Sequence, residues 1–463
     1  MVGGSPAPRR DVPDPDAAPG AVDPPRKGHI GLIVALSMLG GLILALVLTV
    51  FVFGGATEPV ISGVALLAFA LGWATLAWLS SRRTDQPQTW AYVPATVMGV
   101  IGLFHLIFRP SDDVLRAFGW VWPIVAAGLA IWMVIQSRRS LHNWSRFAFI
   151  YPVLAVLLLA AVGGGYETIR ETQDDSAIAM AGQLFDVGGH KLHISCTGSG
   201  NPTVILEAGL GQPAAEIAGW IQPGVASTTR VCVHDRAGSG SSELADSPQD
   251  GIAIATDLHA LLTEAEIDGP YVLAGHSSGG VYVQVFAARY QEDVAGIVLL
   301  DSQPPDALEN LPGYAGEYSA IRSTYALGPS LARVGLLRLL YVSVPSDLPP
   351  EAWAEARMSM STATHNRGVR DDVVGLKAAL AQAQALTTLG DKPLIVVTAA
   401  EDAHEGWLRL QDEMATLSTN SAHRVIQEAT HTSLIEDRAD SAISIQAILD
   451  VVEAVRSGAT LRP

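Results

Sequence analysis

Long apolar stretches separated by short polar segments fill the first third of the chain. They lie at residues 30–53, 60–79, 90–108, 119–136 and 147–165. A helix needs about 20 apolar residues to cross the hydrocarbon core of a bilayer. The first stretch is too long for the apolar part of a signal peptide, and no small-residue cleavage site follows it. The pattern therefore predicts an all-α transmembrane region of about five helices at residues 30–165.

The segments that flank this region are polar. Residues 1–29 are rich in Pro, Asp, Ala and Gly and carry almost no large apolar side chains, which predicts a disordered tail. Residues 166–182 are predicted to be a polar linker, and residues 183–463 a soluble domain.

Basic residues gather at alternate ends of the predicted spans. One side holds Arg9, Arg10, Arg26, Lys27, Arg82, Arg83, Arg138, Arg139 and Arg146. On the other side are a turn near Glu58, and a loop in which Arg109 and Arg116 are offset by Asp112 and Asp113. Because cytoplasmic loops are enriched in Lys and Arg, the first side is predicted to be cytoplasmic. An odd number of spans then places the soluble domain on the extracytoplasmic side of the cell membrane.

After residue 182 the pattern changes to short apolar runs that alternate with helical segments. The runs lie at residues 192–196, 203–209, 230–235, 271–275, 296–301 and 393–399, with helical patterns such as 253–266 and 281–291 between them. Near-continuous apolar strands that alternate with helices predict a mostly parallel sheet covered on both faces. Sites in such sheets lie at the carboxyl ends of the strands.

Charge and cysteine content exclude some classes of partner. From residue 166 onward the chain has 18 Lys and Arg against 38 Asp and Glu, which disfavours nucleic acid as a partner. The two cysteines, Cys196 and Cys232, do not have metal-ligand spacing. The sequence therefore predicts neither a nucleic-acid interface nor a metal site.

The strongest chemical motif is Gly275-His276-Ser277-Ser278-Gly279, which follows one apolar run and precedes a helical segment. A tight strand-to-helix turn with small residues on both sides presents a serine at the edge of the sheet. Ser277 has the required flanking glycines, whereas the adjacent Ser278 does not. We therefore predict Ser277 as a nucleophile.

A serine nucleophile needs a base and an orienting carboxylate. His431 is the preferred base because it follows a strand-like stretch and precedes the last helix; His404 and His423 stay as competitors. Asp402, just after the run at 393–399, is the preferred acid. Asp301 and Glu401 are the alternatives.

The negative charge that develops on the substrate needs backbone N–H donors. The natural pair is the N–H of Ser278, after the nucleophile, and the N–H of Leu210 in the turn that follows the run at 203–209.

These motifs, in this order, resemble the α/β-hydrolase superfamily. The similar segments are GGHKLHISCTGSG (188–200), ILEAGLG (205–211), HDRAGSGSS (234–242), LAGHSSGG (273–280), VLLDS (298–302), VVTAAED (396–402) and ATHTSL (429–434). The resemblance implies an eight-stranded, mostly parallel sheet, with Ser277, Asp402 and His431 as the triad. It also implies a helical cap at residues 303–389 that lines an apolar pocket. Many members have His-Gly where this chain has Ala208-Gly209, a departure in the oxyanion loop.

The same fold places the strand with Cys196 beside the strand with Cys232, which makes a disulfide between them a hypothesis.

Together these features predict a membrane-anchored serine hydrolase that cleaves an ester or lipid-like substrate without a metal or organic cofactor. Amide and thioester substrates stay open, because a fold does not fix a function. The alternatives are a membrane signalling or binding protein that has lost catalysis, and a perhydrolase-type enzyme on the same fold.

Overall fold

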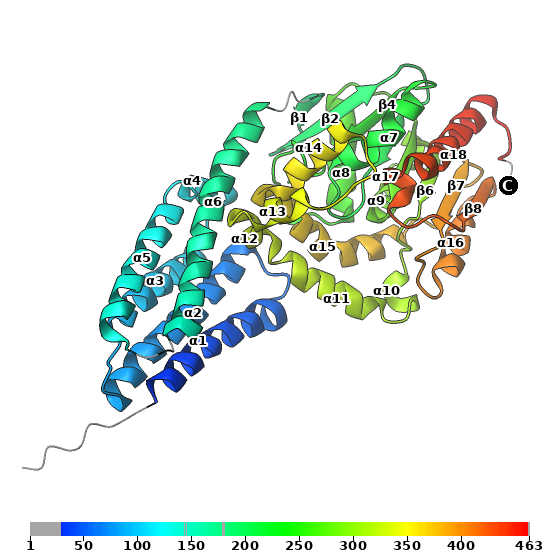
Figure 1. Ribbon diagram of the computed structural model, residues 1–463. Coiled ribbons are helices and arrows are strands. Elements are labelled where there is room, and N and C mark those ends of the chain that lie inside the picture. The colour runs from blue at the N-terminus through cyan, green and yellow to red at the C-terminus, as the bar shows by residue number, and fades with distance from the viewer. Residues whose placement is uncertain (1–28, 143, 145, 178–180, 462–463) are drawn as a thin grey trace, which may run out of the picture.

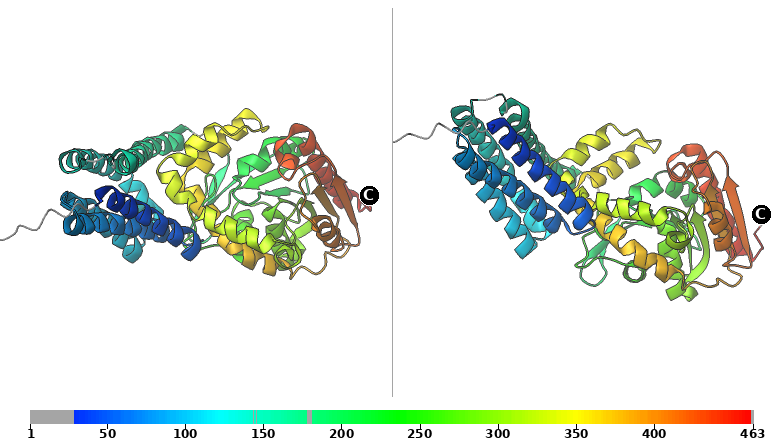
Figure 2. Two further views of the ribbon diagram at one scale, coloured as in Figure 1. Left: turned by 60° about the horizontal axis from the view of Figure 1, so that its bottom comes forward. Right: turned by 90° about the horizontal axis from the view of Figure 1, so that it is seen from below.

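The computed structural model describes residues 29–142, 144, 146–177 and 181–461. Apart from His29, the tail predicted at residues 1–29 lies outside the described residues. A bundle of helices forms one end of the molecule, and an α/β domain forms the other, with the C-terminus far from the bundle (Figures 1 and 2).

The bundle contains the predicted spans. Its elements are α1 (Ile30–Leu46), a π-helical turn (Val47–Val52), α2 (Glu58–Arg83), a 3₁₀ turn (Thr89–Ala91), α3 (Tyr92–Phe108), α4 (Asp112–Phe118), α5 (Trp122–Ser140), a π-helical turn (Arg146–Ile150) and α6 (Tyr151–Ala177). Four of the described helical segments are long and apolar enough to cross a membrane. The pair α4 and α5, bent by 49°, would make a fifth span.

Two features of the bundle differ from the prediction. The predicted span at 119–136 corresponds to α5, which begins at Trp122. Pro123 fits in its first turn, because the N–H group that proline lacks would have no intrahelical acceptor there. The predicted linker at residues 166–182 is largely helical, since α6 continues to Ala177. Polar side chains of this extension bind the α/β domain: Glu167 and Asp174 pair with Arg338 at 2.6 and 2.8 Å.

The α/β domain is built on one sheet of eight strands in the order β1-β2-β4-β3-β5-β6-β7-β8. The strands are β1 (Gln183–Asp186), β2 (Lys191–Thr197), β3 (Val204–Glu207), β4 (Val231–His234), β5 (Tyr271–His276), β6 (Val294–Leu300), β7 (Leu394–Ala399) and β8 (Ser421–Ile426). The pairs β1–β2 and β2–β4 are antiparallel and the other pairs are parallel. The predicted eight-stranded, mostly parallel sheet is confirmed.

Helices cover both faces of the sheet, as the apolar strand pattern requires. They are α7 (Ala214–Ala226), α8 (Gly251–Glu264), α9 (Ser278–Arg289), a 3₁₀ turn (Gln291–Asp293), α16 (Trp407–Ala415), α17 (Ser433–Glu436) and α18 (Arg438–Ser457). Successive strand residues point to opposite faces. Ile297 and Leu299 of β6 therefore join a core with α8 and α9, whereas Val298 and Leu300 join a second core with α7 and α18.

The segment between β6 and β7 is helical, as predicted for the cap. It contains α10 (Ala307–Asn310), α11 (Tyr314–Tyr325), α12 (Gly328–Arg333), α13 (Leu336–Val342), α14 (Pro350–Ser361) and α15 (Ala363–Ala383). The cap lies between the sheet and the helical bundle (Figure 1).

Buried charges join the cap to the bundle. Arg333 at the end of α12 pairs with Glu58 at 2.6 Å and also with Asp112, and Arg367 of α15 pairs with Glu58 at 2.5 Å. Glu58 is only 2% exposed, and both arginines contact its carboxylate. Because Glu58 starts α2 and Arg82 and Arg83 end it, the predicted cytoplasmic loops lie at the end of the bundle away from the cap.

The two cysteines are joined by a disulfide. Cys196 of β2 lies directly opposite Cys232 of β4 in the sheet register, and the two side chains are bonded. The hypothesis of a Cys196–Cys232 bridge therefore agrees with the structure.

We predict that protein extracted from native membranes in the presence of an alkylating agent carries no free thiol, as measured by intact mass. The double variant Cys196→Ser/Cys232→Ser should lose about 3–4 kcal/mol of stability, seen as a lower thermal unfolding midpoint, because the bond closes a loop with a sequence separation of 36. Two alkylated cysteines in the wild-type protein would contradict the bridge.

Candidate active site

Ser277 occupies a strained turn between β5 and α9. Its φ of 57° and ψ of −126° are rarely adopted by a residue other than glycine. The backbone on both sides holds it: its N–H donates to the carbonyl of Leu300 at 3.1 Å, and its carbonyl accepts from the N–H of Gln303 at 3.0 Å.

The flanking glycines are needed for close approach of the chain segments. A Cβ added at Gly275 would lie 2.6 Å from the carbonyl carbon of Gly279, and one added at Gly279 would lie 2.3 Å from the carbonyl oxygen of Glu207. Any side chain at either position would therefore push the turn apart. The predicted strand–turn–helix geometry around Ser277 is present.

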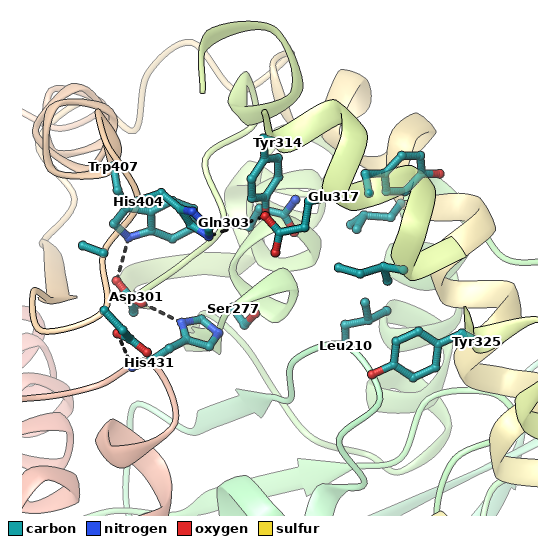
Figure 3. Close-up of a pocket in the computed structure, with 15 residues that line it drawn as sticks. Leu210, Ser277, Asp301, Gln303, Tyr314, Glu317, Tyr325, His404, Trp407 and His431 are labelled. Carbon is teal, nitrogen blue, oxygen red and sulfur yellow. Dashed lines mark hydrogen bonds and ion pairs between the residues drawn. The ribbon is translucent and has the colours of Figure 1, made fainter. Parts of the chain in front are cut away.

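His431 lies in the loop between β8 and α17, with its imidazole between Asp301 and Ser277 (Figure 3). The ring Nδ1 is 2.6 Å from Oδ2 of Asp301. If Nδ1 carries the proton that it donates to this carboxylate, Nε2 is free to accept a proton from a neighbouring hydroxyl. Of the three candidate histidines, His431 is the one at the serine.

Asp301 is held as an orienting carboxylate should be. It follows β6, it is 3% exposed, and its φ of 40° turns the chain in the left-handed region. Its Oδ1 accepts from the indole N–H of Trp407 at 2.8 Å and from the N–H of Ala399 at 3.3 Å. These donors fix the carboxylate and leave Oδ2 for the imidazole.

The structure differs here from the preferred triad, which had Asp402 as the acid. Asp402 is exposed, and its Oδ1 accepts from the backbone N–H of His431 at 3.0 Å instead of contacting the ring. The neighbouring Glu401 is also exposed, and its backbone N–H donates to the carbonyl of Ala429. Strands β6 and β7 are adjacent, so both ends reach the histidine loop, and Asp301 is the acid that meets the imidazole.

The competing histidines have other partners. His423 lies on β8, where its ring nitrogens contact Asp412 at 2.6 Å and Thr398 at 2.8 Å. His404 lines the same cavity as Ser277 but pairs with Glu317 at 3.7 Å.

The two predicted oxyanion donors lie on either side of the serine. Ser278 is the first residue of α9, so its N–H belongs to the positive end of that helix. Leu210 lines the cavity together with Ser277, and a Cβ added at the preceding Gly209 would lie 3.0 Å from the Cβ of Ser277. The Ala208-Gly209 turn therefore packs directly against the serine.

Arg236 holds the Ala208-Gly209 turn in place. Its guanidinium donates to the carbonyls of Ala208 at 2.7 Å and Gly209 at 2.8 Å, and it also binds Glu207 and Asp372. Burial alone would raise the pKa of Glu207, but the charges and hydrogen bonds of His234 and Arg236 lower it below its ordinary value. Glu207 is therefore charged, and His234 and Arg236 compensate its buried charge.

His276 links the oxyanion turn to the histidine loop. One ring nitrogen lies 2.9 Å from the carbonyl of His431, and the other lies 3.0 Å from Oε1 of Gln212, which also accepts from Gly209 N–H at 2.8 Å. Burial, together with the charge of His431, lowers the pKa of His276 to about 3, so His276 is neutral. His276 is a positioning residue that stays uncharged near neutral pH.

A cavity of about 380 Å³ opens over Ser277 (Figure 3). One wall is a stripe of α11, in which Tyr314, Tyr318, Ile321 and Tyr325 recur at helical spacing. Trp407 also lines the cavity, next to Tyr314, with 6.5 Å between their ring centroids. An apolar lining from the cap was predicted, but these four side chains of α11 were not, although their helical spacing in the sequence carried that signal.

No group of three or more His, Cys, Asp or Glu side chains that could hold a metal ion occurs among the residues that the structure describes.

Comparisons with known proteins agree with this architecture. A family model described as alpha/beta hydrolase fold matches residues 202–438. An uncharacterized protein of Schizosaccharomyces pombe is 31% identical over 188 residues, which cover 34% of this chain and 35% of that protein. An uncharacterized vacuolar membrane protein of Saccharomyces cerevisiae is 28% identical over 199 residues, which cover 36% of this chain and 31% of that protein. The match thus spans about a third of each of these two relatives.

Among solved structures, the Cif epoxide hydrolase from Acinetobacter nosocomialis superposes with a TM-score of 0.51 at 16% identity. The superposition covers 62% of this chain and 96% of that protein. At this identity the likeness concerns the fold alone.

The placement of the two acids predicts different effects of two matched substitutions. Asp301→Asn should slow phosphonylation of Ser277 by a fluorophosphonate about 10³- to 10⁴-fold, because an amide favours the wrong imidazole tautomer. Asp402→Asn should slow it less than about 10-fold, because that carboxylate contacts only the loop backbone. The measurement is the second-order labelling rate of each purified variant; a larger effect at Asp402 would contradict the assignment of Asp301.

Proposed function

Because the chain belongs to the α/β-hydrolase fold family, we propose that its C-terminal domain is a serine hydrolase that cleaves an ester-like substrate through an acyl-enzyme at Ser277. The observation that carries the proposal is the alignment of Ser277, the imidazole of His431 and the buried carboxylate of Asp301 (Figure 3).

The arrangement supports a two-step acyl transfer. Ser277 Oγ attacks the substrate carbonyl while His431 Nε2 takes its proton, and Asp301 stabilises the imidazolium that forms. The N–H groups of Leu210 and Ser278 bind the oxyanion. His431 then returns the proton to the leaving alcohol, and a water molecule activated by the same histidine releases the acid from Ser277. Asp301 takes the role that the sequence analysis gave to Asp402.

The cavity favours a substrate with an apolar part. Tyr318, Ile321 and Leu376 line part of it, and such aromatic and aliphatic side chains exclude water from an acyl or alkyl chain. The cap that supplies these side chains is bound to the membrane helices by Arg333. A lipid-like ester drawn from the membrane therefore suits the site better than a small polar ester.

Two features support an extracytoplasmic position for the site. The cap contacts the bundle at the ends marked by Glu58 and Asp112, whereas Arg82 and Arg83 lie at the other end of α2. A disulfide on the α/β domain is also typical of an oxidising compartment.

A membrane-impermeant fluorophosphonate, applied to intact cells that express wild-type protein or Ser277→Ala, tests both the nucleophile and its side of the membrane. We expect labelling of the wild type in intact cells and no labelling of the variant. Ser278→Ala serves as the matched control, because its backbone N–H is retained, and it should still be labelled.

Labelling that occurs only after lysis would keep the nucleophile and overturn the extracytoplasmic position. Absence of label in folded wild-type protein, before and after lysis, would overturn the hydrolase and favour a non-catalytic membrane protein.

A further inference from the structure

The cap presents an apolar surface that neither the cavity nor the core uses. It consists of Leu336, Leu339, Leu340 and Val342 of α13 together with Val344, and we call it the α13 face. Leu339, Leu340 and Val342 are 68%, 51% and 65% exposed. Large apolar patches of this kind mark interaction surfaces on proteins.

The other side of α13 is firmly attached. Arg338, which is 8% exposed, binds Glu167 of α6 with two hydrogen bonds of 2.6 and 2.8 Å and Asp174 of α6 with one of 2.8 Å. Tyr341 packs in a small apolar cluster with Trp353 of α14. One side of α13 therefore contacts α6 and α14, and the other side carries the exposed leucines.

The start of α13 lies against a transmembrane segment. A Cβ added at Gly163 of α6 would lie 2.2 Å from the carbonyl oxygen of Val334, and one added at Gly335 would lie 2.6 Å from the carbonyl oxygen of Gly163. The turn before α13 thus touches the backbone of α6 directly, and Figure 1 shows α13 beside α6.

The position of Gly163 along α6 gives the depth of this contact. Gly163 belongs to the candidate span Arg146–Asp174, whose basic end starts at Arg146. The helix from Phe147 to Gly163 rises about 24 Å at about 1.5 Å per residue. This height is close to the far edge of a hydrocarbon core about 30 Å thick. On either side of Gly163, Val162 and Tyr166 of α6 are 63% and 55% exposed, as residues that face lipid would be.

We propose that the α13 face is a lipid-binding surface that lies in the bilayer interface beside α6, on the side of the membrane that carries the α/β domain. An interfacial helix inserts its apolar side about 5–10 Å into the boundary between headgroups and acyl chains. The turn before α13 touches α6 inside its candidate span, next to the exposed Val162 and Tyr166, which is the reason to choose lipid as the occupant over a second protein. Arg338 of α13 is already paired with Glu167 and Asp174. The α13 face therefore binds lipid through its apolar side chains and needs no anionic headgroup.

This surface does not depend on the chemistry at Ser277, but it has a consequence for the cap. The helix α13 is held by the bundle and the bilayer together, which sets the cap, and the cavity under it, close to the membrane surface.

Spin labelling of single cysteine variants tests the proposal. Both native cysteines are bonded to each other, so an introduced thiol is the one that reacts. The test variant is Leu339→Cys, with Leu340→Cys as a second site should the first fail to fold. Val162→Cys on α6 is the lipid-facing control, and Val425→Cys on β8, 37% exposed, is the water-facing control. Each full-length variant is reconstituted into phosphatidylcholine vesicles.

The measurement is the ratio of spin-label collision rates with oxygen, which is enriched in lipid, and with a nickel chelate, which stays in water. We expect the ratio at residue 339 to approach that at residue 162 and to exceed that at residue 425 several-fold. A ratio equal to that at residue 425 would place the α13 face in water and overturn the proposal. Low collision rates with both reagents would mean that protein covers the face, which would overturn it as well.

Discussion

The site depends on a strained turn that brings three chain segments together at Ser277. The left-handed φ of 57° is unfavourable for serine, so the surrounding structure must hold it. Backbone hydrogen bonds to Leu300 and from Gln303 tie the turn to the end of β6 and the start of the cap. The absence of side chains at Gly275 and Gly279 lets β5, α9 and the oxyanion turn approach within contact distance. The same contacts that impose the strain therefore place the serine, the acid-bearing strand and the oxyanion donors next to one another.

Buried charges then position the cap over this turn from two sides. On the site side, Arg236 joins the oxyanion turn to Asp372 of α15. On the membrane side, Arg333 and Arg367 meet Glu58 at the start of α2. A buried ion pair adds little net stability, but removal of one partner leaves a desolvated charge that costs about 3–5 kcal/mol. Such pairs specify one arrangement of cap, sheet and bundle. Helix α15 takes part on both sides, because it carries both Arg367 and Asp372.

The sequence carried enough information for most of the elements and for part of the site. The runs that became β3 to β7 are apolar because both faces of a parallel sheet are buried, and Ser277 and His431 stand in loops that such a sheet brings together. Strand β1 lies at the edge of the sheet and is largely exposed, so it has no comparable apolar signal.

The choice between Asp301 and Asp402 depended on contacts that no local pattern reveals. Both acids follow strands of the sheet, and those strands are neighbours. Two features distinguish Asp301 from Asp402. The indole N–H of Trp407 and the left-handed backbone at Asp301 orient its buried carboxylate toward the imidazole of His431. The helical extension of α6 was missed for a similar reason: Glu167 meets Arg338, which is 171 positions away in the sequence. Composition alone made that stretch look like a linker.

The most direct test of the account is to locate the adduct that forms when the purified full-length protein reacts with a fluorophosphonate, by mass spectrometry of its peptides. The account predicts one phosphonyl group per chain, on the Oγ of Ser277. An adduct on Ser278 or another residue, or an unmodified protein that is otherwise folded, would contradict the claim that this turn holds an activated nucleophile.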